Sequence, residues 1–265
     1  MLLFHTHQEF ESPEALKDTI KCFWYERRDY PDQETSYEIL PDGYIEIIFQ
    51  FGSLSSIGPD GFLLPLPSPY IMGLLNQPIY LSAKNRIEIL GIRCYPWTVF
   101  DMLGLPTGKN GLQYITHPMA ALQSELQEYI TAGQPEAAVA ILRNYFQSAT
   151  SLLAIDMTLF KAGAAMTEAK GTLSVSEVAA AANATVRTLE RKFKQSSGHT
   201  VKDVSGLMRF EQVRNQLWLF PDTNLAGLAA ELGYTDQAHL SREFKRYSGT
   251  TPAAFARKHK AQQKP

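Results

Sequence analysis

Residues 225–255 read LAGLAAELGYTDQAHLSREFKRYSGTTPAAF, and they decide the fold of the C-terminal part of the chain. The first apolar residues have helical spacing, and Gly233 follows as the left-handed end of a helix would. Asp236 can cap a second helix, because its carboxylate accepts the free amides of the first turn. In that helix Leu240 and Phe244 lie four residues apart on one face. The stretch therefore predicts a helix-turn-helix, whose second helix can offer polar side chains to a DNA major groove.

The pattern occurs a second time in residues 173–200, LSVSEVAAAANATVRTLERKFKQSSGHT. A shift of 51 positions aligns Val178 with Ala229, Thr185 with Asp236, Leu189 with Leu240, Arg191 with Arg242, Phe193 with Phe244, Gly198 with Gly249 and Thr200 with Thr251. These matches at one offset predict two copies of one supersecondary unit. Ala182-Asn183 then stands where the second copy has Gly233-Tyr234, so we expect the first turn to be strained or differently shaped.

The segment 171–260 resembles the DNA-binding domain of the AraC/XylS family of transcription regulators, most specifically in LGYTDQAHLSREFKRYSGTTPAAF. The resemblance implies two helix-turn-helix units joined by a longer central helix. We expect that helix in VKDVSGLMRFEQVRNQLWLF, with an apolar side formed by Val204, Leu207, Met208, Val213, Leu217 and Trp218. The implied function is sequence-specific binding of double-stranded DNA by a bacterial-type regulator, more often an activator, which would work with RNA polymerase.

The resemblance also selects the DNA-binding positions residue by residue. In the first recognition helix they are Arg187, Glu190 and Arg191, with Lys194 on the same face. In the second they are Gln237, Ala238, His239, Ser241 and Arg242. An arginine can make two parallel hydrogen bonds to guanine, a glutamine can pair with adenine, and a glutamate can accept from cytosine N4. Lys192, Lys194, Lys245 and Arg246 are expected to face phosphate or solvent, where they add affinity that falls with salt.

Other roles stay open for three of these residues. Arg191 and Arg242 can instead form salt bridges to a neighbouring helix. Glu190 can pair with Arg187 or Lys194 on its own helix. At the start of the first unit, Ser174 and Glu177 have the spacing of a capping box.

Residues 1–115 are predicted to be β-rich. TIKCFWYERR, SYEILPDGYIEIIFQF, PIYLSA and RIEILGIRCY are apolar runs bounded by turn residues. In the second run Glu46 and Gln50 alternate with apolar residues, as in a sheet with unequal faces. Residues 52–69, rich in Gly, Ser and Pro, are expected to form a long surface loop.

The runs CFWYERR, ILPDGYIEIIF and IEILGIRCYPWTVFDMLGLP resemble an uncharacterised N-terminal domain of a subset of AraC-type regulators, over residues 8–115. The resemblance implies a sensory or assembly role. The effector is then a small molecule or, alternatively, a partner protein only. No cupin-type pair of metal-binding motifs is found, and no metal or cofactor is expected.

Residues 116–168 have helical periodicity and predict a connector of three helices. We expect these helices to pack on the β domain and on each other. The alternative is a dimerisation surface, which keeps a homodimer open. Ala169-Lys170-Gly171 is expected to be the hinge into the DNA-binding domain, 169–265. The predicted fold is α+β: a β-rich sensor-like domain, a helical connector and an all-α domain with two helix-turn-helix units.

The charge distribution favours a polyanion partner for one end of the chain. Residues 171–265 carry 14 basic and 8 acidic side chains, a net charge of +6, whereas residues 1–170 carry −8. The start, MLLFHTHQEF, is a poor signal peptide, and no apolar run is long enough to span a membrane, so we expect a cytoplasmic protein.

No catalytic constellation is evident, and an enzyme fused to a DNA reader is the least favoured alternative. Cys22 and Cys94 are isolated within predicted strands, unlike the cysteine cluster of alkyl-transfer repair activators. Glu46 and Glu88 are attributed to a solvated strand face. His5 and His7 share a strand face but have no visible third ligand, so a surface pair is favoured over a metal site.

Overall fold

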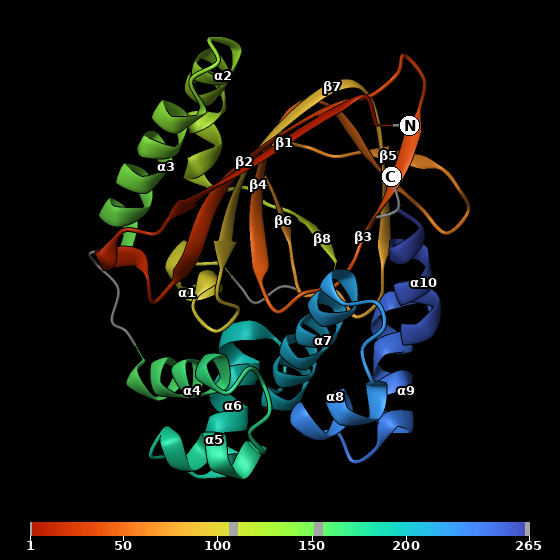
Figure 1. Ribbon diagram of the computed structural model, residues 1–265. Coiled ribbons are helices and arrows are strands. Elements are labelled where there is room, and N and C mark those ends of the chain that lie inside the picture. Colours follow the sequence, from red (N-terminus) through yellow and green to blue (C-terminus); the bar gives the residue numbers. More distant parts are fainter. Residues whose placement is uncertain (1, 106–110, 151–155, 263–265) are drawn as a thin grey trace. The chain divides into compact units, whose positions relative to one another are not determined.

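The computed structural model describes residues 2–105, 111–150 and 156–262, and the chain divides into two compact units (Figure 1). The first, called the β unit here, comprises Met1–Ile39, Tyr44–Gly73 and Ile79–Ala154. The second, the helical unit, comprises Leu40–Gly43, Leu74–Pro78 and Ile155–Pro265. A β-rich N-terminal part and an all-α C-terminal part are thereby confirmed. No helix within the described ranges is long and apolar enough to cross a bilayer.

The β unit is built on one antiparallel sheet. Its strands are β1 (Phe4–Glu11), β2 (Ile20–Asp29), β3 (Thr35–Ile39), β4 (Ile45–Ile57), β5 (Leu63–Pro65), β6 (Tyr70–Met72), β7 (Ile79–Cys94) and β8 (Leu112–Tyr114). The order is β1-β2-β7-β4-β6-β8, with β3 also paired to β7 and β5 to β4. Short 3-10 turns lie at Glu14–Leu16 and Pro118–Leu122. The helices are α1 (Val99–Leu103), α2 (Gln123–Thr131) and α3 (Pro135–Thr150).

Two sequence predictions about the sheet were wrong. The runs PIYLSA and RIEILGIRCY are one continuous strand, β7, in which Asn85 takes a positive φ of 59° between them. The expected surface loop 52–69 contains a hairpin, because β4 continues to Ile57 and pairs with β5. The tight turn is closed where the Gly58 N–H donates to the Phe62 carbonyl at 2.9 Å. The Gly, Ser and Pro residues of this stretch are typical of loops, and they concealed the two strands.

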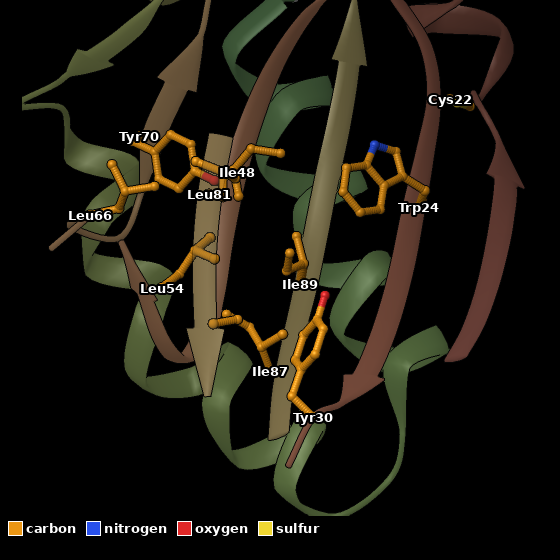
Figure 2. Packing of buried hydrophobic residues seen from close by; sticks show 11 residues of the cluster. Cys22, Trp24, Tyr30, Ile48, Leu54, Leu66, Tyr70, Leu81, Ile87 and Ile89 are labelled. Atoms are coloured by element: carbon orange, nitrogen blue, oxygen red, sulfur yellow. The ribbon is translucent and has the colours of Figure 1, made fainter. Parts of the chain in front are cut away.

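Residues 45–51 of β4 are buried on both faces, so the solvated face expected at Glu46 does not exist. Trp24, Ile48, Tyr70 and Ile89 belong to one apolar cluster (Figure 2). Glu46 is only 3% exposed and accepts hydrogen bonds from Trp24 Nε1 and Arg93 Nε, each at 2.7 Å. A buried carboxylate needs such donors, because an unpaired charge would be too costly to desolvate.

Helices α2 and α3 pack within the β unit, as the first of the two interpretations of the connector predicts, but the third connector helix, α4 (Met157–Glu168), belongs to the helical unit. Leu126 and Ile130 of α2 are buried, as are Leu142 and Phe146 of α3. The Phe146 ring lies 6.4 Å from that of Phe23 in the sheet. This apolar stripe is therefore occupied in a single chain.

The helical unit consists of seven helices within the described residues. They are α4 (Met157–Glu168), α5 (Val175–Ala181), α6 (Val186–Ser197), α7 (Val201–Leu219), α8 (Leu225–Glu231), α9 (Gln237–Ser248) and α10 (Pro252–Gln262). Phe193, Phe210 and Phe244 are among its largest fully buried side chains. The central helix α7 buries the predicted apolar residues except Trp218, which is 49% exposed and whose ring lies 4.1 Å from that of His259 at a tilt of 41°. Leu152 and Ile155, assigned to the third connector helix, lie outside the described residues.

The predicted hinge at 169–171 is a closely packed turn between α4 and α5. Lys170 and Gly171 have positive φ angles of 52° and 75°. A Cβ atom on Gly171 would lie 2.4 Å from the Ser205 carbonyl oxygen, so only glycine fits against α7. Arg209 Nη1 of α7 donates to the Gly171 carbonyl at 2.9 Å. This turn is therefore part of the helical unit's packing.

Candidate DNA interface

The first helix-turn-helix comprises α5 and α6, and its caps are those expected from the sequence. Ser174 and Glu177 form a reciprocal capping box at the start of α5. The Thr188 N–H donates to Thr185 Oγ1 at 3.2 Å, which caps α6. Gly198 ends α6 with φ 77°. Each cap satisfies a backbone group that the helix end would otherwise leave unpaired.

The second unit, α8 and α9, repeats this construction. The His239 N–H donates to Asp236 Oδ1 at 2.6 Å, and Gly249 ends α9 with φ 70°. Leu240 and Phe244 of α9 are buried, as are Leu189 and Phe193 of α6. Both recognition helices therefore bury the predicted apolar face.

The register of the repeat differs from the single offset of 51 residues. The recognition helices keep that offset, whereas α5 and α8 begin 50 residues apart, at Val175 and Leu225. The second turn is therefore one residue longer. Asn183 (φ 52°) and Gly233 (φ 69°) occupy equivalent left-handed positions. The first turn is therefore differently shaped, as predicted, but the pairing of Ala182 with Gly233 was wrong, because the ungapped alignment compared different positions of the turn.

Most of the predicted DNA-binding side chains are exposed on the two recognition helices. On α6 these are Arg187, Arg191 and Lys194, and on α9 they are Gln237, Ala238 and Arg242. In the described part of the chain, Arg187, Arg191 and Arg242 make no ion pair, although a salt bridge to a neighbouring helix had been an alternative for two of them. Their guanidinium groups thus remain available to an external acceptor.

Two charged side chains of α6 are engaged within the protein instead. Glu190 is half-buried, and its Oε2 accepts from the Val201 N–H at 3.4 Å, at the start of α7. Within the described residues, neither Arg187 nor Lys194, the two expected partners on α6, forms an ion pair with Glu190. Lys192, expected to face phosphate or solvent, forms an ion pair with Asp156. Burial acts to raise the pKa of Asp156, but the Lys192 contact and two backbone amides of α4 outweigh burial and lower it.

His239 and Ser241 lie at the half-buried margin of α9. The His239 ring meets the ring of Tyr234 edge-on, with centroids 5.3 Å apart. Its Nδ1 lies 3.4 Å from Thr235 Oγ1. These contacts fix the ring beside the tight turn and leave part of it facing outward.

Arg209 of α7 is a support for the second unit that the sequence did not reveal. Its Nη2 donates to both carboxylate oxygens of Glu243 on α9, each at 3.2 Å, and both side chains are 14% exposed. Its guanidinium carbon lies 5.2 Å from the centroid of the Tyr234 ring. Arg209 and Glu243 are 34 residues apart in the sequence and lie on different helices, so no local sequence spacing could have predicted the contact. It fixes α9 on the central helix.

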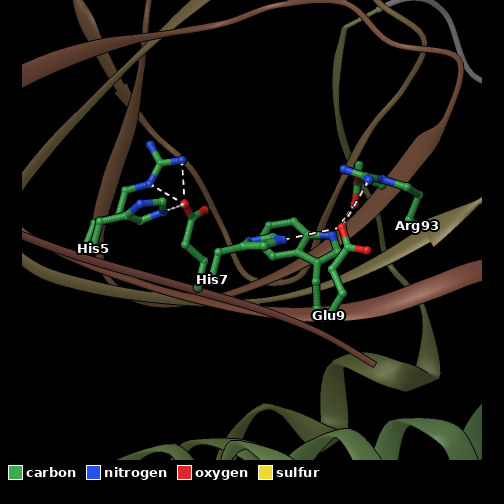
Figure 3. Close-up of polar contacts among 8 residues, drawn as sticks. His5, His7, Glu9 and Arg93 are labelled. Carbon is green, nitrogen blue, oxygen red and sulfur yellow. Dashed lines mark hydrogen bonds and ion pairs between the residues drawn. The ribbon is translucent and has the colours of Figure 1, made fainter. Parts of the chain in front are cut away.

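Other candidate sites have structural explanations. His5 Nε2 lies 2.5 Å from Glu26 Oε1, and His7 Nε2 lies 3.5 Å from Glu9 Oε1 (Figure 3). The described residues contain no group of three or more His, Cys, Asp or Glu that could hold a metal. Cys22 and Cys94 are buried free thiols. Burial raises the pKa of Cys22 to about 11, which disfavours the reactive thiolate.

Comparison with protein families finds two domains in the chain. A helix-turn-helix domain model matches residues 178–258. A domain of unknown function, DUF6597, matches residues 8–115. Comparison with curated proteins finds no match. The family match covers both recognition helices and the central helix between them.

Solved structures with low sequence identity also resemble the chain. Unsaturated fatty acid-bound ToxT from Vibrio cholerae strain SCE256 is 11% identical, with a TM-score of 0.49, over 88% of this chain and 94% of that one. The DNA-binding domain of AdpA in complex with a target DNA is 23% identical, with a TM-score of 0.37, over 41% and 97%. An AraC-type regulator from Chromobacterium violaceum is 22% identical, with a TM-score of 0.36, over 40% and 95%.

Proposed function

Since the chain is a DNA-binding transcription regulator with an AraC-type helix-turn-helix domain, we propose that α6 and α9 each read one segment of a long, asymmetric DNA site. The observation that carries the proposal is the exposed polar face on both helices, opposite a buried apolar face. The central helix α7 has 19 residues and a length of about 28 Å. If α7 is rigid, the two recognition helices enter successive major grooves about 34 Å apart.

The proposed DNA contacts fall into three groups. Arg187, Arg191, Gln237 and Arg242 read base edges, because they are exposed and can make paired hydrogen bonds. His239 and Ser241 contact DNA from the margin of α9, and Lys194 contacts phosphate. Glu190 is assigned to holding the start of α7, since its carboxylate already accepts the Val201 N–H.

Selection of DNA from a random library by the full-length chain tests this function. We expect two short motifs spaced by about one helical turn. Arg191→Ala should relax the preference within the first motif and Arg242→Ala within the second, each by roughly 1–3 kcal/mol per base pair read. Arg257→Ala, which removes an exposed arginine of α10, is the matched control. Unchanged motifs in both recognition-helix variants would refute the assignment of these arginines.

Salt titration separates phosphate contacts from base contacts. Removing one phosphate contact lowers the slope of log K against log salt by about 0.9. Lys194→Ala should therefore reduce this slope and weaken all sequences alike. Lys192→Ala should leave it unchanged, because Lys192 is engaged with Asp156. Equal slopes for the two variants would contradict the proposed role of Lys194.

We further propose that the β unit senses an effector, a small molecule or a partner protein, and that the regulator activates transcription with RNA polymerase in the cytoplasm. The support is the separate domain over residues 8–115, which has its own buried core. A ligand that binds the folded β unit raises its melting temperature. Screening the full chain for such shifts, followed by transcription assays on the selected site, tests both points. A shift without any change in DNA binding or transcription would count against sensing.

A further inference from the structure

Strand β1 forms one edge of the sheet, and no strand in the described ranges pairs with its outer side. It has eight residues, Phe4–Glu11, in continuous register with β2. All of them are exposed except Phe10, which is half-buried. An open edge presents unpaired N–H and C=O groups, and natural edge strands are usually blunted by proline, lysine, a bulge or short length. β1 has no proline, lysine or bulge, and its only carboxylates are Glu9 and Glu11 near its C-terminal end.

The other outer strands are much less suited to pairing. β8 and β5 have three residues each, and β5 ends in Pro65, which has no N–H to donate. β3 has five residues. Among the described strands, β1 is therefore the edge that offers a long ladder to a partner.

The side chains of β1 are complementary to those of a second β1 running in the opposite direction. His5, His7, Glu9 and Glu11 alternate along the strand, so they lie on one face, with histidines at one end and carboxylates at the other. Figure 3 shows His5, His7 and Glu9 aligned on this face. Antiparallel pairing brings the histidine end of one copy beside the carboxylate end of the other.

We propose that two copies of this chain dimerise by antiparallel pairing of their β1 strands, with the two-fold axis at Gln8. His7 of each copy then faces Glu9 of the other, and Thr6 faces Phe10. Two neighbouring registers also keep these four side chains on one face of the sheet. One is centred on His7 and places His7 opposite His7 of the other copy. The other is centred on Glu9 and places Glu9 opposite Glu9. Cross-strand pairs of opposite charge stabilise a sheet, and like charges destabilise it. This choice fixes the register.

One hydrogen bond between α3 and β1 uses the main chain of β1, at Glu11, and another uses the side chain of Gln8. Arg143 Nη2 donates to the Glu11 carbonyl at 2.6 Å, at the end of β1. Gln8 Nε2 donates to Glu136 Oε1 at 3.1 Å through an exposed side chain. The central five residues, Thr6–Phe10, are sufficient for a symmetric ladder.

Disulfide trapping in the full-length chain tests the register. In an antiparallel ladder, residues directly opposite have Cα atoms about 4.5–5.5 Å apart, within the range of a disulfide. Gln8→Cys should therefore give a covalent dimer on mild oxidation. The control Thr6→Cys should not, because the two Thr6 positions are four residues apart along the ladder, about 13 Å. The native cysteines are buried and do not compete. Equal trapping of both variants, or trapping of the control alone, would overturn the proposal.

Charge exchange tests the interface without a covalent bond. Sedimentation velocity would measure the mass of the full chain over a range of concentrations. His7→Glu places glutamates opposite each other twice per dimer, and Glu9→Lys places lysine opposite His7 twice, so each variant alone should dimerise about tenfold more weakly. An equimolar mixture restores opposite charges in both pairs and should recover dimers. Recovery also shows that each variant is folded.

These experiments measure only mass and cross-linking, so their results do not depend on whether the DNA-binding proposal is correct. A wild-type chain that stays monomeric at all concentrations refutes the β1 dimer. A dimer whose affinity is unchanged in both charge variants also refutes it, and would indicate another interface, such as α2 and α3. A dimer weakened by each variant and recovered in the mixture supports it.

Discussion

The two helix-turn-helix units share their caps and buried faces but differ in how their recognition helices are held. Helix α6 is held by an ion pair from Lys192 to Asp156 of α4, with side chains 27% and 33% exposed. Helix α9 is held by the Arg209–Glu243 pair to α7, with both side chains 14% exposed. Helices α7 and α9 also approach each other closely. A Cβ atom on Gly206 of α7 would lie 3.0 Å from the hydroxyl of Tyr247 on α9. Equivalent sequence patterns therefore produce different attachments.

The difference indicates which helix can change position more easily. An ion pair between partly exposed groups contributes little, because water and salt screen it. A less exposed pair is expensive to break, because removal of one partner leaves the other charge unpaired. We therefore expect α9 to be fixed on the central helix and α6 to be the more adjustable of the two.

The largest expected effect is the loss of a buried ring from either recognition helix. Phe193→Ala and Phe244→Ala should each lower the free energy of unfolding of the helical unit by about 3–5 kcal/mol, because both rings are at most 1% exposed. The ring of Phe244 lies 5.1 Å from that of Phe210 and 5.4 Å from that of Phe255, so its loss also removes two ring contacts. Urea unfolding followed by far-ultraviolet circular dichroism, to which the helices contribute most, measures this. Losses below about 1 kcal/mol would mean that these faces are not packed as described.

The two ion pairs give the next effect and test the comparison directly. Glu243→Ala should cost about 3 kcal/mol, because it leaves Arg209 without its carboxylate. The matched change in the first unit, Lys192→Ala, should cost no more than about 1 kcal/mol. In DNA selection, Glu243→Ala should weaken the second motif and retain the first. Similar costs for both variants would show that the two helices are held equally.

The caps and apolar faces of both units could be predicted because they are local. A capping residue and a pair of apolar residues four apart act within one or two turns of helix. The extra residue in the second turn was missed because an ungapped comparison aligned Ala182 with Gly233. Alignment on residues that tolerate a left-handed backbone would have paired Asn183 with Gly233.

The missed contacts all join distant parts of the sequence. Lys192 and Asp156 lie 36 residues apart, and neither position has a local signal for the other. Glu46 was assigned to a solvated face because alternation along one strand cannot show what covers it. Its partners Trp24 and Arg93 come from β2 and β7. The predicted base-reading role of the exposed arginines stays a prediction until DNA binding is measured.

The tight turns should respond more weakly than the ion pairs. Asn183 and Gly233 both have left-handed backbones, so replacing either with alanine should cost roughly 1 kcal/mol. Asn183→Gly and Gly233→Asn should each stay within about 0.5 kcal/mol of the parent, since both residues tolerate this conformation. A Cβ atom at Gly233 would lie 3.5 Å from the Thr172 carbonyl oxygen and 3.7 and 3.9 Å from two carbon atoms of Thr172, all ordinary contacts. Thermal unfolding of the four variants checks the equivalence, and a large loss in Gly233→Asn would reject it.

The smallest expected effect concerns pH and distinguishes the first unit, since His199 follows α6 whereas Thr250 follows α9 at the equivalent position. Burial lowers the pKa of His199, and Lys194 acts in the same direction, while Asp203 opposes them. The unfolded chain therefore binds more protons just below the ordinary histidine pKa, near 6.5. Stability of the helical unit should fall as the pH drops through 6.5 toward the folded-state value, and the loss should be complete below it. Melting temperatures between pH 7.5 and 5.5 should show this fall in the parent and a smaller one in His199→Gln. The same decline in both proteins would assign the pH dependence to other groups.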